Sequence, residues 1–164
     1  MALDLWWRLG QLSGSDQASS QASAADLASA RLSALGTLAS SYVQLRAADA
    51  EAALLQNTVQ GFERSLQIAR NRYAAGIAAN TDVLQAQTQL ANTRADLVGV
   101  QADRAKLEHA IAVLVGSAPA NFTLAPLATA WVPTVPVVPV GVPSTLLQRR
   151  PDIVAAERDV AVAN

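Results

Sequence analysis

All seven prolines of the 164-residue chain lie between Pro119 and Pro151, so the first 118 residues contain none. Proline inside a helix removes a backbone donor and costs about 3 kcal/mol, which makes a long proline-free run permissive of continuous helix. The chain has 35 alanines, whereas aromatic residues make up only 4%. Small side chains suit helices that lie close together over a long, thin contact. We therefore expect an elongated, all-α protein.

Apolar residues recur in heptads through the proline-free part of the chain. One series runs from Leu27 to Tyr73 and a second from Val83 to Leu114, each in alternate steps of four and three residues. A period of about 3.5 residues is typical of helices packed lengthwise as in a coiled coil. We call the two series the assembly seams, and their main members are Leu38, Leu45, Leu55, Val59, Phe62 and Leu66 in the first and Val83, Leu90, Leu97, Leu107, Ile111 and Leu114 in the second.

Two arginines interrupt these apolar seams, Arg31 in the first and Arg104 in the second. Each can extend from the edge of the seam to water, with its aliphatic stem covering apolar surface. Each can instead form a buried ion pair with an acidic residue of a neighbouring helix. Both interpretations remain open from the sequence.

A short joint at residues 74–82 separates the two seams. Gly76 suits a backbone position with positive φ just beyond a helix, where other residues are strained. Asn80, Thr81 or Asp82 can cap the second helix by accepting a hydrogen bond from its free N–H groups. The sequence therefore predicts that the chain turns back here.

The predicted helices cover about residues 18–75 and 80–115, which gives an antiparallel, coiled-coil-like hairpin with unequal arms. An irregular, extended segment at 117–143 follows, because it contains most of the prolines. This segment is too apolar for a free linker, so we expect it to lie against the helices or a neighbouring subunit, with Trp131 as an anchor.

Short helices are expected to begin at the last two prolines, Pro143 and Pro151. Proline is favoured in the first turn of a helix, where its missing N–H costs nothing. Asp152 follows directly, and an acidic side chain is stabilising in that first turn. The chain therefore continues as helix to its last residues.

Charge and chemistry-bearing residues exclude several function classes. The net charge is −1, and the 12 basic residues are scattered among 13 acidic ones, which disfavours nucleic-acid binding. There is no cysteine, and the single histidine, His109, cannot assemble a multi-histidine metal site. Because no nucleophile or paired-carboxylate motif is present either, we expect no catalytic residue, no metal and no cofactor.

Four segments of the chain resemble the outer membrane efflux proteins, the TolC-like exit ducts, and especially the branch that serves resistance-nodulation-division drug pumps. These are Leu3-Asp4-Leu5-Trp6 with Arg8, the stretch from Tyr73-Ala74-Ala75-Gly76-Ile77 to Gln87, residues 108–116, and residues 141–153 with Gln148-Arg149-Arg150-Pro151-Asp152. The last two segments are the most specific.

The resemblance implies a trimer in which each subunit contributes four membrane strands to a β-barrel and a set of long helices to a periplasmic tunnel. This chain would supply about one hairpin of that α-helical tunnel. The implied division is the end of a membrane strand and corner at 1–8, the periplasmic helical hairpin at 9–116, a Pro-rich equatorial segment at 117–143, and the start of the second structural repeat at 144–164.

The resemblance also assigns roles at the hairpin tip. An adaptor protein is expected to contact Arg72, Tyr73, Gly76, Ile77 and Thr81, and Asp82 matches an acidic gate residue that pairs across subunits in some members. The basic partner in those members belongs to the second repeat. A structural explanation coexists for Asp82, because acids in the first turn of a helix are stabilised by its dipole.

The predicted function is that of the outer membrane channel component of a tripartite efflux system in a Gram-negative bacterium. Its expected partners are two further copies of itself, a periplasmic adaptor and an inner membrane pump, with no nucleic acid. It is not expected to be an enzyme. Two alternatives remain open from the sequence: the coiled-coil hairpin of a periplasmic adaptor protein, and a generic helical interaction domain.

Overall fold

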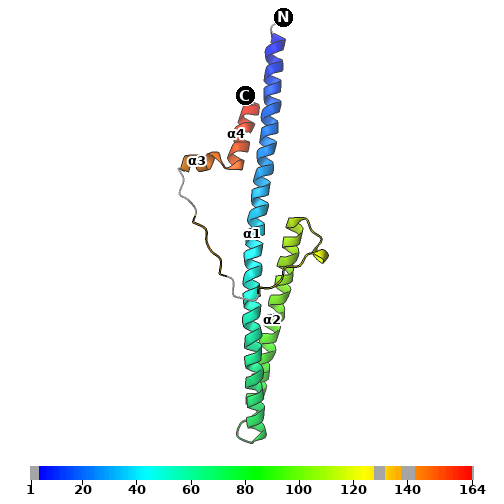
Figure 1. Ribbon diagram of the computed structural model, residues 1–164, viewed down its shortest axis with the longest axis vertical. Coiled ribbons are helices and arrows are strands. Elements are labelled where there is room, and N and C mark those ends of the chain that lie inside the picture. Colours follow the sequence, from blue (N-terminus) through cyan, green and yellow to red (C-terminus); the bar gives the residue numbers. More distant parts are fainter. Residues whose placement is uncertain (1–3, 128–131, 138–142, 164) are drawn as a thin grey trace. The chain divides into compact units, whose positions relative to one another are not determined.

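The computed structural model describes residues 4–127, 132–137 and 143–163, with side chains for 10–127, 132–137 and 144–163. These residues form helices α1 (Asp4–Ala74), α2 (Asn80–Val115), α3 (Pro143–Gln148) and α4 (Pro151–Ala163), and the short 3-10 turn η1 (Pro119–Asn121) (Figure 1). No strand occurs in the described ranges, which confirms the all-α prediction.

The chain divides into two compact units, and α1 contributes to both. The hairpin unit is Leu38–Pro133, and the terminal unit combines Met1–Thr37 with Thr134–Asn164. No helix of the described residues is both long and apolar enough to cross a membrane.

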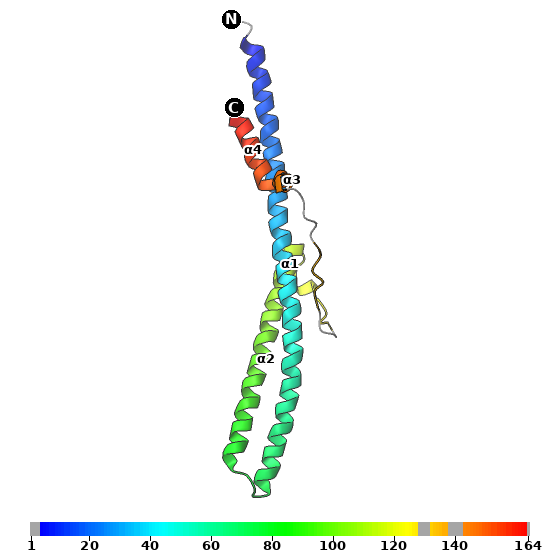
Figure 2. The same ribbon diagram turned by 90° about the vertical axis from the view of Figure 1, so that its left-hand side faces the viewer.

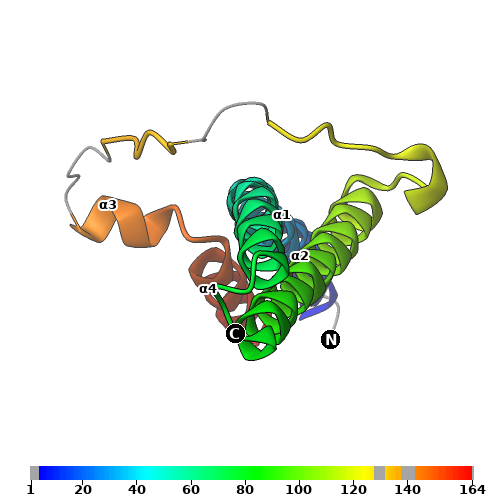
Figure 3. The ribbon, with the colours of Figure 1, turned by 90° about the horizontal axis from the view of Figure 1, so that it is seen from below.

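In the hairpin unit, α2 runs back alongside the second half of α1 (Figures 1 and 2). Figure 3, seen from below, shows the same two helices side by side at the closed end of the hairpin. The core there contains Leu66, Val83 and Leu90, each at most 7% exposed. The residues packed against this core are Val59, Phe62, Ala69 and Ala86. The predicted antiparallel hairpin is therefore present.

The heptad seams face each other inside this hairpin. In the first seam every position from Leu38 to Ala69 is buried or half-buried, and in the second so is every position from Val83 to Ile111. Leu45 is completely buried, whereas Leu114 is 38% exposed. The seams thus pack α1 against α2 within one chain, and their use between subunits stays a prediction.

The start of α1 differs from the expected one. We expected a strand end over 1–8 and the first helix from about residue 18, but α1 is helical from Asp4 onward, and residues 1–3 lie outside the described part. A helix bonds its own N–H and C=O groups, whereas a strand needs a neighbouring strand. The strand prediction is therefore wrong for residues 4–8. Gly10 and Gly14 are tolerated within the helix at about 1 kcal/mol each.

Glycine ends both arms of the hairpin. Gly76 and Gly116 have φ angles of 73° and 78°, the left-handed conformation that closes a helix. The prediction for Gly76 is confirmed. The capping prediction is wrong: Ala79 occupies the N-cap of α2 and no side chain caps the helix. Since α2 begins at Asn80, the side chains of 80–82 already lie inside the first turn.

In the terminal unit, α4 packs beside the first part of α1 (Figures 1 and 2). Four alanines are buried in this unit, Ala18, Ala22 and Ala25 on α1 and Ala155 on α4. Small side chains let the two backbones approach closely. Helices α3 and α4 begin at Pro143 and Pro151, as predicted.

The Pro-rich segment is irregular where it is described. After η1, residues 122–127 and 132–137 have no regular secondary structure, in agreement with the prediction. The carbonyls of residues 124 and 125 accept hydrogen bonds from side chains of α2 and α1. Val132, Val135 and Val137 are at least 82% exposed, so their expected contact with a neighbouring subunit stays a prediction. Trp131, the expected anchor, lies outside the described residues.

Candidate functional site

The hairpin tip is closed by backbone hydrogen bonds alone. The N–H of Gly76 donates to the carbonyl of Tyr73 at 2.9 Å, and that of Ile77 donates to the carbonyl of Arg72 at 3.0 Å. This pair of bonds is the Schellman motif, which satisfies the last carbonyls of a helix. Because the backbone makes the turn, the side chains at the tip are left free for other contacts.

The predicted tip residues lie together at this end of the hairpin. Tyr73 is 49% exposed and Ile77 is 69% exposed. Arg72, Thr81 and Asp82 are also exposed. None of the described residues forms an ion pair with Asp82. The structure thus gathers polar and apolar side chains at one solvent-facing end but does not supply a cation for Asp82.

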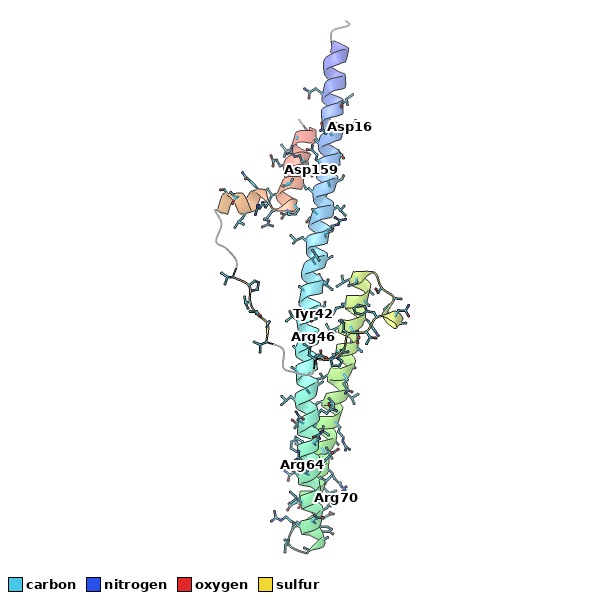
Figure 4. The ribbon with its side chains drawn as sticks, viewed as in Figure 1. Asp16, Tyr42, Arg46, Arg64, Arg70 and Asp159 are labelled. Atoms are coloured by element: carbon cyan, nitrogen blue, oxygen red, sulfur yellow. The ribbon has the colours of Figure 1, made fainter. Side chains whose placement is uncertain are left out.

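Two grooves flank the packed seam near the tip. The Arg70 groove, of about 300 Å³, is lined by Glu63, Leu66, Gln67, Arg70, Leu90 and Arg94. The Asp82 groove, of about 310 Å³, is lined by Phe62, Ser65, Asp82, Gln85, Ala86 and Gln89. Figure 4 labels Arg70 near the closed end of the hairpin.

The two grooves differ in charge. The Arg70 groove has two arginines and one glutamate, and the Asp82 groove has one aspartate and no cation. In the first groove Arg94 pairs with Glu63 at 2.6 Å, with side chains 56% and 47% exposed. An exposed pair of this kind contributes at most about 1 kcal/mol. Arg70 therefore leaves the Arg70 groove with an excess positive charge.

A buried charged cluster lies farther from the tip and consists of Arg46, Asp49, Arg104 and Glu108. Asp49 pairs with Arg46 at 2.9 Å and with Arg104 at 2.6 Å, and its side chain is 4% exposed. Arg104 also pairs with Glu108 at 2.8 Å. The two positive and two negative charges balance, as buried charges require.

The charged cluster also binds the backbone of the Pro-rich segment. Arg104 Nη2 donates to the carbonyl of Leu124 at 2.5 Å, and Arg46 Nη1 donates to the carbonyl of Ala125 at 2.9 Å. In the opposite direction, the N–H of Leu124 donates to Glu108 Oε1 at 2.6 Å. Hydrogen bonds to charged groups are the stronger class in proteins.

Hydrogen bonds raise the pKa of both arginines of the cluster. The hydrogen bond with Asp49 raises the pKa of Arg104 above its ordinary value, against the opposing effect of burial. A hydrogen bond with Tyr42 is the main cause that raises the pKa of Arg46, with Asp49 also contributing. The guanidinium of Arg46 lies 4.8 Å from the centre of the Tyr42 ring, within cation–π range (Figure 4).

Sequence reasoning found one member of the charged cluster. Of the two interpretations of Arg104, the structure supports the buried pair, whereas Arg31 is exposed. Arg46, Asp49 and Glu108 were missed. Their spacing is the available signal, because Arg46–Asp49 and Arg104–Glu108 are i,i+3 and i,i+4 pairs beside the seams.

The described residues contain no group of three or more side chains suited to holding a metal ion. His109 is exposed on α2.

Comparison with known proteins gives a consistent result. The family model described as outer membrane efflux protein matches residues 1–117. The chain is 30% identical to nodulation protein T of Rhizobium leguminosarum bv. trifolii over 151 residues, which is 90% of this chain and 32% of that protein. It is 31% identical to the probable efflux pump outer membrane protein TtgC of Pseudomonas putida, covering 83% of this chain and 28% of TtgC.

Among solved structures, the outer-membrane channel OprN matches 98% of this chain and 36% of its own, with a TM-score of 0.87 and 34% identity. The likeness to OprN covers both the hairpin and the residues that follow it. The chain spans about a third of the length of the curated relatives it matches.

Proposed function

We propose that this chain, which belongs to the outer membrane efflux protein family, contributes one helical hairpin to the wall of the periplasmic tunnel of an efflux duct. The observation that carries the proposal is the fold match to the channel OprN over 98% of the chain. A helix pair that is packed along a seam and exposes apolar side chains such as Leu54 and Val98 on its outer faces suits a wall built from neighbouring helix pairs.

The tip is the proposed docking site for a periplasmic adaptor. Tyr73 and Ile77 expose apolar surface there, and the backbone turn is satisfied without using a side chain. Exposed aromatic and aliphatic side chains beside charged ones are typical of protein interaction surfaces. Arg72, Gly76 and Thr81 complete the proposed contact.

Asp82 is the proposed gate residue. It lies in the first turn of α2, is exposed, and borders a groove that has no cation. A carboxylate that pairs with none of the described residues is suited to pair with a cation from another part of the duct. Such a pair closes the tunnel when made and opens it when broken.

The whole duct is proposed to be a homotrimer in the outer membrane and periplasm of a Gram-negative bacterium, working with an inner membrane pump. Family membership supports this assignment, since its relatives include an efflux pump outer membrane protein. It disfavours the alternatives of an adaptor hairpin and a generic helical interaction domain. Transport through the duct requires no catalytic residue in this chain.

Export in living cells tests the proposal. The full-length protein, with its own pump and adaptor, is expressed in a Gram-negative strain that lacks its native duct, and loss of a preloaded fluorescent dye is followed. We expect dye export, and we expect Ile77→Asp to reduce both export and adaptor cross-linking while Ile77→Leu keeps them. Absence of export with a correctly inserted protein would argue against the duct.

A further inference from the structure

The charged cluster joins three parts of the hairpin unit that are far apart in sequence. Asp49 lies on α1, Arg104 and Glu108 lie on α2, and Leu124 lies in the segment after η1. The bond from Arg46 to Ala125 spans 79 residues. A joint of this kind can fix the segment to both helices at once.

Asp49 lies at the centre of this joint, although its side chain bonds to Arg46 and Arg104 and to none of the described residues of the segment. One of its carboxylate oxygens accepts from Arg46 at 2.9 Å and the other accepts from Arg104 at 2.6 Å. Each arginine then donates to a segment carbonyl, Arg104 to Leu124 and Arg46 to Ala125. Because a guanidinium is planar and rigid, a bond to one of its nitrogens sets the direction of the others.

We propose that Asp49 is the positioning residue of a clasp that fixes the segment at Leu124 to both α1 and α2, so that the three move as one body. Without the Asp49 charge, the charged cluster keeps two largely buried guanidinium groups and one carboxylate, that of Glu108. The repulsion between the guanidinium groups in a poorly solvated site drives them toward water and withdraws the donors that hold the segment.

The neighbouring carboxylates give this proposal a clean comparison. Glu108 contacts the segment directly, since it accepts from the Leu124 N–H at 2.6 Å. Glu51 lies on α1 two residues after Asp49, but its side chain is exposed. Changing each of these carboxylates to its amide therefore separates three effects. Glu108→Gln tests a direct contact with the segment, Asp49→Asn tests an indirect one, and Glu51→Gln tests a general loss of negative charge.

Hydrogen–deuterium exchange at the Leu124 amide tests the clasp in the full-length protein purified in detergent. We expect Asp49→Asn to accelerate that exchange about tenfold or more, because bonds to charged groups are the stronger class. Glu108→Gln should have a comparable effect, and Glu51→Gln should have none. Arg104→Lys is a milder variant that keeps the charge, and it should also accelerate exchange because one ammonium cannot replace the guanidinium fork.

Two results would overturn the proposal. In the first, the Leu124 amide exchanges at the wild-type rate in Asp49→Asn but faster in Glu108→Gln. Asp49 would then not position the arginines that hold the segment. The other is equal loss of protection in Asp49→Asn at Leu124 and along the tip half of α2, around Leu90, since that is general unfolding. The proposal goes beyond the proposed duct function and does not depend on it.

Discussion

Gly76 and Gly116 have positive φ angles, whereas Gly99 lies within α2. None of the three has an atom near enough to obstruct a methyl group. Backbone conformation alone therefore decides the effect of an added Cβ. In the left-handed region it costs about 1–2 kcal/mol, whereas within a helix replacing glycine by alanine gains about 0.5–1 kcal/mol.

Paired alanine variants should therefore change stability in opposite directions. We expect Gly76→Ala to lower the free energy of unfolding by about 1 kcal/mol and Gly99→Ala to raise it by about 0.5–1 kcal/mol. Urea unfolding followed by circular dichroism measures both. A shift of the same sign in the two variants would contradict the assigned turn.

A buried charged side chain should contribute more to the free energy of unfolding than an exposed one. Glu108 is 13% exposed at the side chain and bonds both Arg104 and the Leu124 N–H, whereas the Lys106–Asp103 pair is 76% and 68% exposed. We expect Glu108→Gln to cost about 1.5–3 kcal/mol of unfolding free energy. Lys106→Met should change it by less than about 0.5 kcal/mol. If the two variants changed the free energy of unfolding equally, in thermal or urea unfolding, the charged cluster would not stabilise the fold more than an exposed pair does.

The helical elements owe their stability to the seam rather than to their outer faces. Leu66 is 7% exposed in the core, whereas Leu54, on the same helix, is 66% exposed. Leu66→Ala should lower the free energy of unfolding by about 2–5 kcal/mol, with a loss of helical circular dichroism at lower urea concentration. Leu54→Ala is the control and should stay within about 0.5 kcal/mol. The reverse order would place the core on the wrong face.

The element boundaries show where sequence reasoning succeeds and where it fails. The expected start and end of α2 agree with the structure, because the Gly76 turn precedes it and Gly116 with Pro119 follows it. The start of α1 was missed because Gly10 and Gly14 lower helix propensity, which the continuous helix overrides. The missing cap on α2 follows from Ala79, which has no polar side chain to offer.

The charged cluster illustrates a different limit. Its two ion pairs within single helices follow from local spacing. The bonds to Leu124 and Ala125, in contrast, join residues up to 79 positions apart. Local patterns contain no information on which loop reaches a buried arginine. The turn at Gly76, in contrast, follows from local chemistry, because a positive φ at a glycine determines where the chain reverses, and the roles of the tip residues stay predictions.

At the scale of the whole molecule, the chain spans about a third of the length of the curated relatives it matches, and its proposed role is to supply one part of a tunnel wall. Its seams are already used between α1 and α2. The exposed apolar side chains of the hairpin include Ile68 and Val98, which are 59% and 64% exposed. Exposed apolar side chains of this kind suit contacts with other helices, as the proposed tunnel requires.

The most direct test of a tunnel that passes the hairpin tip is to block export reversibly at the proposed gate residue. The chain has no cysteine, so Asp82→Cys introduces a single thiol into it. In cells expressing the full-length protein, a bulky methanethiosulfonate reagent should slow dye export through the Asp82→Cys variant, and a reductant should restore it. The parent protein, treated in the same way, should be unaffected. Unchanged export despite complete modification of the thiol, measured by mass spectrometry, would contradict a tunnel that passes the hairpin tip.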